Sequence, residues 1–450
     1  MKLRLVSAWV LFAGAGVGVE PSRMAQAEMG AAGQALAAAA LDTTTESYEV
    51  DGIRVIHRHN PTNTAVVVHI YLLGGARQVT SATAGIELLM LETSGHGTLH
   101  YPEGEALDAL SRTGSTIKVT AEMDWTTFEL GTIAEELDSA WAVFADRLAH
   151  PKLDSAAVDL VRARMLSARR LNSSRPDALL DKLADSVAFT GHPYAISPIG
   201  TERSLQAITV AEVKRYHSDQ VVKSRLLVLV VGNASRQHVE RLIRERLTVL
   251  PTGNYSWTLP PPVPVRDNSM TILPRTLPTN YIGGYYPGPL ANSKDFPAFR
   301  LATELLSSML YSEIRAERGL SYTAYSPFLE LGASAGGVYA STTTPEKVFP
   351  LIASGMSDVF YARFAGFEMR RFVEQFITEY YLRNETSAGQ ADYLARAELY
   401  RGGWRQAGKF MEELRAVSPA DVRRVARQYM GHVQYVYLGD TTRMKQYLRK

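Results

Sequence analysis

The chain has 450 residues, 46% of them hydrophobic, enough to fill the cores of about two to four domains of ~100–200 residues and to exclude global disorder. Its 48 Lys and Arg residues are balanced by 46 Asp and Glu residues, so no basic field predicts a nucleic-acid partner. The lack of cysteine excludes disulfides, a cysteine-based metal site and a cysteine nucleophile.

Residues 1–27 have the pattern of an export signal peptide. A charged start is followed by an apolar stretch over residues 5–19 and by Ala25-Gln26-Ala27, a small-x-small cleavage site. The apolar stretch is shorter than the ~20 residues of a membrane span, so we expect export rather than a permanent anchor, and a mature chain without a membrane span. A mitochondrial presequence is the other interpretation, but the continuous apolar block lacks its amphipathic, Arg-rich pattern. We expect a periplasmic bacterial protein.

Residues 28–45 are rich in small side chains and predict a tether before the first strands. Val50-Asp51-Gly52-Ile53 predicts a strand, a tight turn and a second strand, and the β-branched run over residues 65–73 predicts a buried strand. Two later segments carry apolar residues three or four apart, a spacing that places each set on one face of a helix. The two sets are Leu137, Trp141, Phe144 and Leu148, and Val158, Val161, Met165 and Ala168.

Residues 205–233 and 414–440 each predict a capped helix followed by an apolar strand. Thr209 with Glu212, and Ser418 with Asp421, have the spacing of a capping box. The similarity favours duplication of one α+β unit, although a helix followed by a strand is also a common arrangement. Four prolines between residues 260 and 264 predict an extended linker over residues 256–268, which separates an N-terminal half at 46–255 from a C-terminal half at 269–450.

Residues 85–98 read GIELLMLETSGHGT, an apolar helical segment that begins with glycine and ends with Gly-Thr. In length and at both ends it resembles the pattern Gly-x-x-His-x-x-Glu-His-x-x-x-x-Gly-Thr of the inverzincin metallopeptidases, the insulinase/pitrilysin family that includes the mitochondrial processing peptidases. The resemblance extends over nearly the whole chain after the export signal. It implies an α+β fold of two homologous α/β-sandwich halves, each an antiparallel-rich sheet covered by helices, which form half of a clamshell.

The zinc-binding residues of that family are missing from the matching positions. The resemblance implies that two histidines and a glutamate on a later helix bind zinc, and that another glutamate activates the bound water. Leu88, Leu91, Glu92 and Ala168 occupy these four positions. A catalytic zinc needs about three protein ligands, so one carboxylate among apolar side chains predicts neither a zinc site nor a general base. We expect this former catalytic face to be packed as core.

Other histidines offer alternative sites. Glu92, His96 and His100 are each four residues apart and would share a helical face if the helix continued. The glycines after Ser94 each weaken a helix interior by ~1 kcal/mol relative to alanine, so we expect the helix to end before a metal site forms. His57 and His59 lie two residues apart on a predicted strand, and we expect them to face solvent.

Two more segments match the family. Residues 114–128 resemble a Gly-x-x-x-Asn-Ala strand followed by Asp-x-Thr-x-aromatic, of which Asp124, Thr126 and Phe128 remain. The resemblance places the asparagine beside the bound peptide in active members, and Lys118 holds that position here. Residues 191–200 match a His-Pro-Tyr…Pro-x-Gly loop that is structural in the family.

Residues 306–325 read LSSMLYSEIRAERGLSYTAY and resemble the family segment Ser-x-Leu-x-x-x-x-Arg-x-x-x-Gly-Leu-x-Tyr. The resemblance implies that Arg315 and Tyr322 bind the peptide backbone, and that the tyrosine stabilises the tetrahedral intermediate. A guanidinium fork and a phenol hydroxyl have the donors that these roles need. Arg318 is the second candidate for the arginine, and an ordinary surface charge beside a half-buried ring is the alternative to any role.

The leading interpretation is a non-catalytic, substrate-binding subunit of an exported heterodimeric zinc metallopeptidase. The chain itself would hold no cofactor, because the zinc-bearing partner subunit of the same family would carry the intact helix. A peptide substrate would bind as an added strand at a sheet edge. A purely structural subunit, as in the core proteins of respiratory complexes, is the first alternative, and an active metallopeptidase using Glu92, His96 and His100 is the second.

Overall fold

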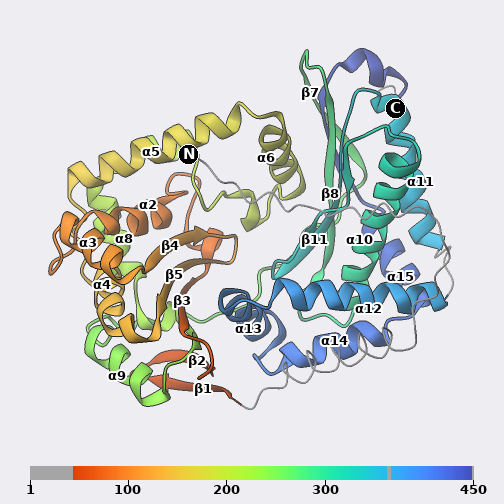
Figure 1. The fold of residues 1–450 in the computed structure, drawn as a ribbon. Helices are drawn as coiled ribbons and strands as arrows, with labels where there is room; N and C mark the ends of the chain where they lie inside the picture. Colours follow the sequence, from red (N-terminus) through yellow and green to blue (C-terminus); the bar gives the residue numbers. More distant parts are fainter. Residues whose placement is uncertain (1–43, 362–365, 448–450) are drawn as a thin grey trace. The chain divides into compact units, whose positions relative to one another are not determined.

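The computed structural model describes residues 44–361 and 366–447 (Figure 1). The predicted export signal at 1–27 and nearly all of the predicted tether at 28–45 lie outside the described residues, and the first strand begins at Thr45. Among the helices of the described ranges, none combines the length and the hydropathy that crossing a membrane requires.

The first sheet has six strands in the order β1-β2-β6-β3-β5-β4. β2 and β6 run parallel, and all other neighbours are antiparallel. The predicted turn is present between β1 and β2. Asp51 and Gly52 both have positive φ, which a tight two-residue hairpin turn requires. The strands are β1 (Thr45–Val50), β2 (Ile53–His59), β3 (Ala65–Leu73), β4 (Thr116–Ala121), β5 (Trp125–Ile133) and β6 (Leu226–Gly232).

Helices cover one face of this sheet, and their apolar sides form a core with alternate residues of its strands. Leu137, Trp141, Phe144 and Leu148 are all buried on one face of α4, as their spacing predicts. The helices of this part are α2 (Ile86–Thr93), α3 (Glu103–Thr113), α4 (Leu137–Ala149), α5 (Ser155–Ser173), α6 (Pro176–Ala188), α7 (Glu202–Ala207), α8 (Val210–Gln220) and α9 (Arg236–Arg246).

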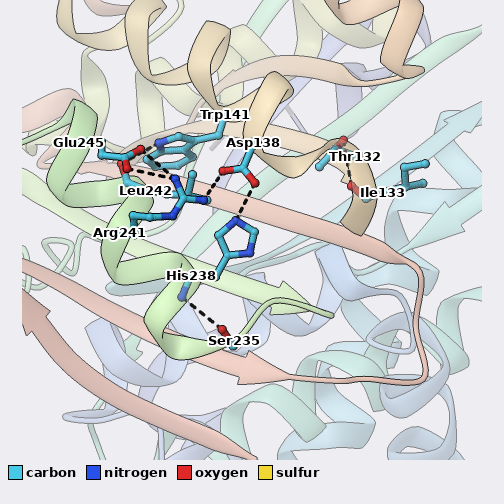
Figure 2. Close-up of polar contacts among 9 residues, drawn as sticks. All are labelled: Thr132, Ile133, Asp138, Trp141, Ser235, His238, Arg241, Leu242 and Glu245. Carbon is cyan, nitrogen blue, oxygen red and sulfur yellow. Dashed lines mark hydrogen bonds and ion pairs between the residues drawn. The ribbon is translucent and has the colours of Figure 1, made fainter.

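Polar contacts fix α4 against α9 (Figure 2). Asp138 in the first turn of α4 accepts hydrogen bonds from Arg241 and from Nε2 of His238, the latter at 3.1 Å. The indole N–H of Trp141 donates to the Leu242 carbonyl at 2.9 Å, so the buried ring leaves no unpaired donor. These contacts hold the two helices that cover the sheet's β3–β6 centre.

The second sheet has the order β10-β11-β8-β12-β7, with β9 also paired to β11. β12 and β7 run parallel, and β12 with β8, and β8 with β11, run antiparallel. The sequence β7-β12-β8-β11-β9 therefore has the order and strand directions of β2-β6-β3-β5-β4 in the first sheet, as a duplicated α+β unit predicts. The strands are β7 (Ser269–Pro274), β8 (Asn280–Leu290), β9 (Thr323–Tyr325), β10 (Phe328–Leu329), β11 (Ala333–Thr342) and β12 (Gln434–Gly439).

The two capped helices predicted at equivalent places are present. Thr209 with Glu212 caps α8, and Ser418 with Asp421 caps α15, each as a complete capping box. Each helix leads to a central strand, β6 or β12. The helices of this part are α10 (Phe296–Leu310), α11 (Pro345–Tyr361), α12 (Gly366–Arg383), α13 (Ser387–Arg401), α14 (Gln406–Ala416) and α15 (Pro419–Val425), and residues 251–268, which include the predicted linker, form neither helix nor strand.

Each sheet receives one helix from the other part of the chain. α13 packs on β3 and β6 of the first sheet, where the Tyr71 hydroxyl donates to Asp392 Oδ1 at 2.6 Å. α6 packs on β8 and β12 of the second sheet, with Leu180 and Ala184 buried against Val436 and Leu438. Each of these helices thus adds buried contacts between the two parts of the chain. No local sequence pattern predicts that α6 and α13 pack on the sheet of the other part.

His57 contradicts the sequence-based expectation that it faces solvent. It is only 1% exposed, whereas His59 is half-buried. The segment between β6 and α9 lies beside this side chain, because the backbone of Ala234 and the charge of Arg236 both act on His57. Burial lowers the pKa of His57, because desolvation disfavours the imidazolium.

Candidate functional site

The four positions that match the family's zinc-binding and general-base residues lie on α2 and α5, which pack together. Leu91 is 1% exposed and belongs to the core, and Leu88 is half-buried. Glu92 and Ala168 are exposed, so the expectation that this whole face is packed as core is wrong for them. On α5, Val158 and Val161 are buried and Met165 is partly buried, but the apolar stripe stops before Ala168 because α2 has only eight residues to cover it.

The charges of two arginines and one histidine act on the one carboxylate at these positions, Glu92. The Glu92 side chain as a whole is exposed, but the atoms packed around its carboxyl group partly desolvate it and raise its pKa. The charges of Arg147, His96 and Arg164 partly oppose this rise. Burial also lowers the pKa of Arg147 to about 10 although Glu92 favours its charge, and its guanidinium donates to the Leu91 carbonyl at 3.4 Å. Two arginines beside one carboxylate repel a cation, so these residues do not fit a zinc ion.

The alternative ligand set does not converge. α2 ends at Thr93, and a short 3-10 turn over Ser94–His96 follows, as the glycines predict. His96 Nε2 lies 3.1 Å from a guanidinium nitrogen of Arg164, and His100 Nδ1 lies 2.7 Å from Asp146 Oδ1. Within residues 44–361 and 366–447, no three His, Asp or Glu side chains are grouped so that they could hold a metal ion.

The other carboxylate on α2, Glu87, is buried and already has partners. Its Oε2 accepts from Arg225 at 2.8 Å and from the Tyr216 hydroxyl at 2.9 Å. Arg225 is 1% exposed and also donates from Nε to the Leu73 carbonyl at 2.8 Å. Glu87 therefore holds α2 against the sheet. Because its carboxylate is buried and paired, it is not available to act as a general base. The sequence motif gave no indication of this network.

Lys118, at the position of the family's asparagine, is exposed on β4. β4 is the edge strand of the first sheet, and the Lys118 ammonium lies 3.6 Å from Glu129 Oε2 on β5. A lysine on an edge strand discourages the addition of another strand. Peptide binding at this edge consequently has less support than binding at the second sheet.

Arg315 and Tyr322 come together at the second sheet. The guanidinium carbon of Arg315 lies 4.6 Å from the centre of the Tyr322 ring, and Tyr322, which directly precedes β9, is 79% exposed. Within residues 44–361 and 366–447, the Arg315 guanidinium forms no hydrogen bond or ion pair. Arg318, the second candidate, instead pairs through Nε with Glu313 Oε1 at 2.8 Å.

A third residue, Tyr311, belongs to this group and was not identified from the motif. α10 continues into a π-helical segment, Tyr311–Glu317, and the Arg315 guanidinium carbon lies 5.2 Å from the Tyr311 ring. The signal in the sequence is an aromatic residue four positions before Arg315, a spacing that makes helical neighbours. π-helical segments are rare and occur often at functional sites.

Asp124, from the family-like Asp-x-Thr-x-aromatic segment, joins the two sheets. It is 1% exposed, and its Oδ2 accepts from Tyr194 and Tyr400 hydroxyls at 2.7 Å each and from the Gly332 amide at 2.9 Å. Tyr194 lies in the His-Pro-Tyr loop, where His192 Nε2 is 2.8 Å from the Pro261 carbonyl. The His-Pro-Tyr loop and the part of the chain that builds the second sheet thus both contact the Asp124 carboxylate, and the linker contacts the loop through Pro261.

Two segments of the chain match sequence models of protein families. "Insulinase (Peptidase family M16)" matches residues 54–202, and "Peptidase M16 inactive domain" matches residues 207–364. A curated relative, "Uncharacterized zinc protease YmxG" of Bacillus subtilis, is 20% identical over 392 residues, which cover 84% of this chain and 93% of the relative. "Cytochrome b-c1 complex subunit 1, mitochondrial" of Caenorhabditis elegans is 22% identical over 178 residues, which cover 40% of this chain and 38% of the relative.

A solved structure has the same fold. The structure described as a protease from Helicobacter pylori superposes with a TM-score of 0.81 at 20% identity, covering 88% of this chain and 99% of that one. Such low identity establishes the fold alone. The two matches follow one another along the chain and together cover most of it. The chain therefore belongs to the insulinase family of peptidases, M16, as a member without the family's zinc-binding residues.

Proposed function

We propose that this chain is a non-catalytic subunit of an exported insulinase-family peptidase, and that it binds extended peptide for a zinc-bearing partner subunit of the same family. Export is inferred from residues 1–27 alone. The partner is inferred from the family resemblance together with the side chains at the zinc positions, two leucines, an alanine and one carboxylate flanked by arginines. At these four positions the chain offers neither a set of zinc ligands nor the general base that would activate a zinc-bound water.

The observation that carries the proposal is the Arg315–Tyr322 pair. The guanidinium has no protein acceptor within the described residues, and the phenol ring beside it is largely exposed. Both groups are donors, which suits peptide carbonyl oxygens and a developing oxyanion. β9, which follows Tyr322 directly, pairs with β11 alone among the described strands, so an extended peptide could add at its other edge.

Peptide binding to the isolated full chain tests the first part of this proposal. We expect Arg315→Ala to raise the Kd of a fluorescein-labelled unfolded peptide by about 10- to 100-fold, since hydrogen bonds from a charged donor are lost. Fluorescence anisotropy measures it. Arg318→Ala is the matched control and is expected to bind as the unchanged chain does, because Glu313 already holds Arg318. Equal binding by the Arg315→Ala variant contradicts the proposal.

Catalysis by a mixture tests the second part. The chain is combined with an insulinase-family chain from the same genome that has an intact His-x-x-Glu-His helix. We expect hydrolysis only in the mixture, and Tyr322→Phe should lower kcat by about 10²-fold with little change in KM, as expected for loss of an oxyanion donor. Tyr325→Phe, at the end of the strand β9 that follows Tyr322, is the control.

A purely structural subunit is the second candidate, favoured by the similarity to a cytochrome b-c1 complex subunit. In that case Arg315 and Tyr322 would be ordinary surface residues. Unchanged peptide binding by the Arg315→Ala variant, with unchanged kcat for Tyr322→Phe, would support this candidate.

A further inference from the structure

The π-helical segment Tyr311–Glu317 places one aromatic ring against Arg315 from within the same helix. Tyr311 and Arg315 are four residues apart, so their side chains are neighbours on the helix surface. The guanidinium carbon of Arg315 lies 5.2 Å from the Tyr311 ring and 4.6 Å from the Tyr322 ring. Both distances are within the ~6 Å at which a cation interacts favourably with an aromatic face.

No carboxylate of this segment holds Arg315. Glu313 accepts from Nε and Nη2 of Arg318, at 2.8 and 2.5 Å, and Glu317 accepts from the Ser312 hydroxyl at 3.2 Å. The contacts that fix the Arg315 guanidinium are therefore contacts with two rings. An ion pair would occupy its N–H donors, whereas ring faces contact the guanidinium without accepting hydrogen bonds from its edge.

We propose that Tyr311 is a positioning residue for the peptide-binding pair, an inference that rests on the proposed function. Tyr311 does not touch the peptide. Its ring holds the Arg315 guanidinium, Arg315 in turn packs on the exposed Tyr322 ring, and the donors of both residues stay directed to a ligand that offers carbonyl or carboxylate oxygens. Without the Tyr311 ring, the long arginine side chain regains rotamers that bind peptide poorly.

Substitutions at position 311 in the full chain test this role, with a fluorescein-labelled unfolded peptide as the probe. Tyr311→Leu is expected to raise Kd by about 3- to 30-fold, and Tyr311→Phe, which keeps the ring, by less than about twofold. Tyr311→Gln is a second ringless variant with the same expectation, should Tyr311→Leu fold poorly. Thermal unfolding of each variant shows whether the fold is retained.

A double-mutant cycle separates positioning from a general structural effect. In the Arg315→Ala background, Tyr311→Leu should cause no further loss of binding, because the residue through which it acts is gone. The matched control is Tyr48→Leu, which removes a comparable ring on β1 of the first sheet. The Arg236 guanidinium carbon, on α9, lies 4.3 Å from the centre of that ring. This control should leave peptide binding unchanged.

The outcomes distinguish this inference from the function on which it rests. If Arg315→Ala weakens binding but Tyr311→Leu does not, the positioning role is wrong and the proposed function stands. Additive losses in the double variant, or a Tyr311→Phe variant as weak as Tyr311→Leu, also overturn the role. If Arg315→Ala itself binds normally, the proposed function fails first.

Discussion

Replacement of Glu87 by alanine is expected to lower the free energy of unfolding by about 3–5 kcal/mol, the range for removing one partner of a buried ion pair. Arg225 would remain 1% exposed without a counter-charge, and the Tyr216 hydroxyl would lose its acceptor. Urea unfolding followed by circular dichroism measures the change. Because Glu87 joins α2 to the sheet, α2 should also lose amide-exchange protection first.

Glu245→Ala is the control for this prediction. Glu245 pairs with Arg241 at 3.0 Å, but both side chains are about half exposed, so the expected loss is at most about 0.5 kcal/mol. A similar loss for both variants would mean that the Glu87–Arg225 pair contributes no more than a surface pair does.

Replacement of Asp124 by alanine is the second large effect, with an expected loss of about 3–5 kcal/mol. The substitution leaves two tyrosine hydroxyls and one amide without their acceptor in a buried place. Since Tyr400 and Gly332 belong to the part of the chain that builds the second sheet, the coupling between the two sheets should weaken. Calorimetry should then show a broadened or divided unfolding transition.

Tyr194→Phe and Tyr400→Phe provide the comparison for Asp124. Each substitution removes one hydroxyl together with the hydrogen bond that it donates to Asp124. The expected loss in the free energy of unfolding is therefore only about 1–1.5 kcal/mol, and unfolding should remain a single transition. An Asp124→Ala protein that unfolds in one sharp transition, with no larger loss than these variants, would contradict the joining role of Asp124.

Local patterns predicted local structure well. The β-branched run forms β3 with the predicted bounds, Ala65–Leu73, the Asp51-Gly52 turn is present, and both capping boxes are complete. These features depend on residues near one another in the chain, where propensity and hydrophobic period act directly. The shared strand order of the two sheets confirms the duplicated fold that two short segments suggested.

Features that depend on distant residues were not predictable. His57 is buried beside Ala234 and Arg236, which lie far from it in the chain, and Ala168 is exposed although it continues the apolar spacing of α5. The exchange of α6 and α13 between the sheets leaves no periodic signal of its own. At the candidate site, the family motif pointed to Arg315 and Tyr322 but does not include Tyr311. The four-residue spacing of Tyr311 and Arg315 is common in helices and does not by itself mark a site.

We claim that residues 44–361 and 366–447 of this chain offer no set of side chains able to hold a hydrolytic zinc ion. Metal analysis of the purified full chain, dialysed after exposure to zinc and assayed alone against unfolded peptide, tests it most directly. We predict that far less than one zinc ion stays bound per chain. We also predict that the chain alone shows no chelator-sensitive hydrolysis of the peptide. A tightly held zinc ion in every chain, together with chelator-sensitive cleavage by the chain alone, would contradict the claim.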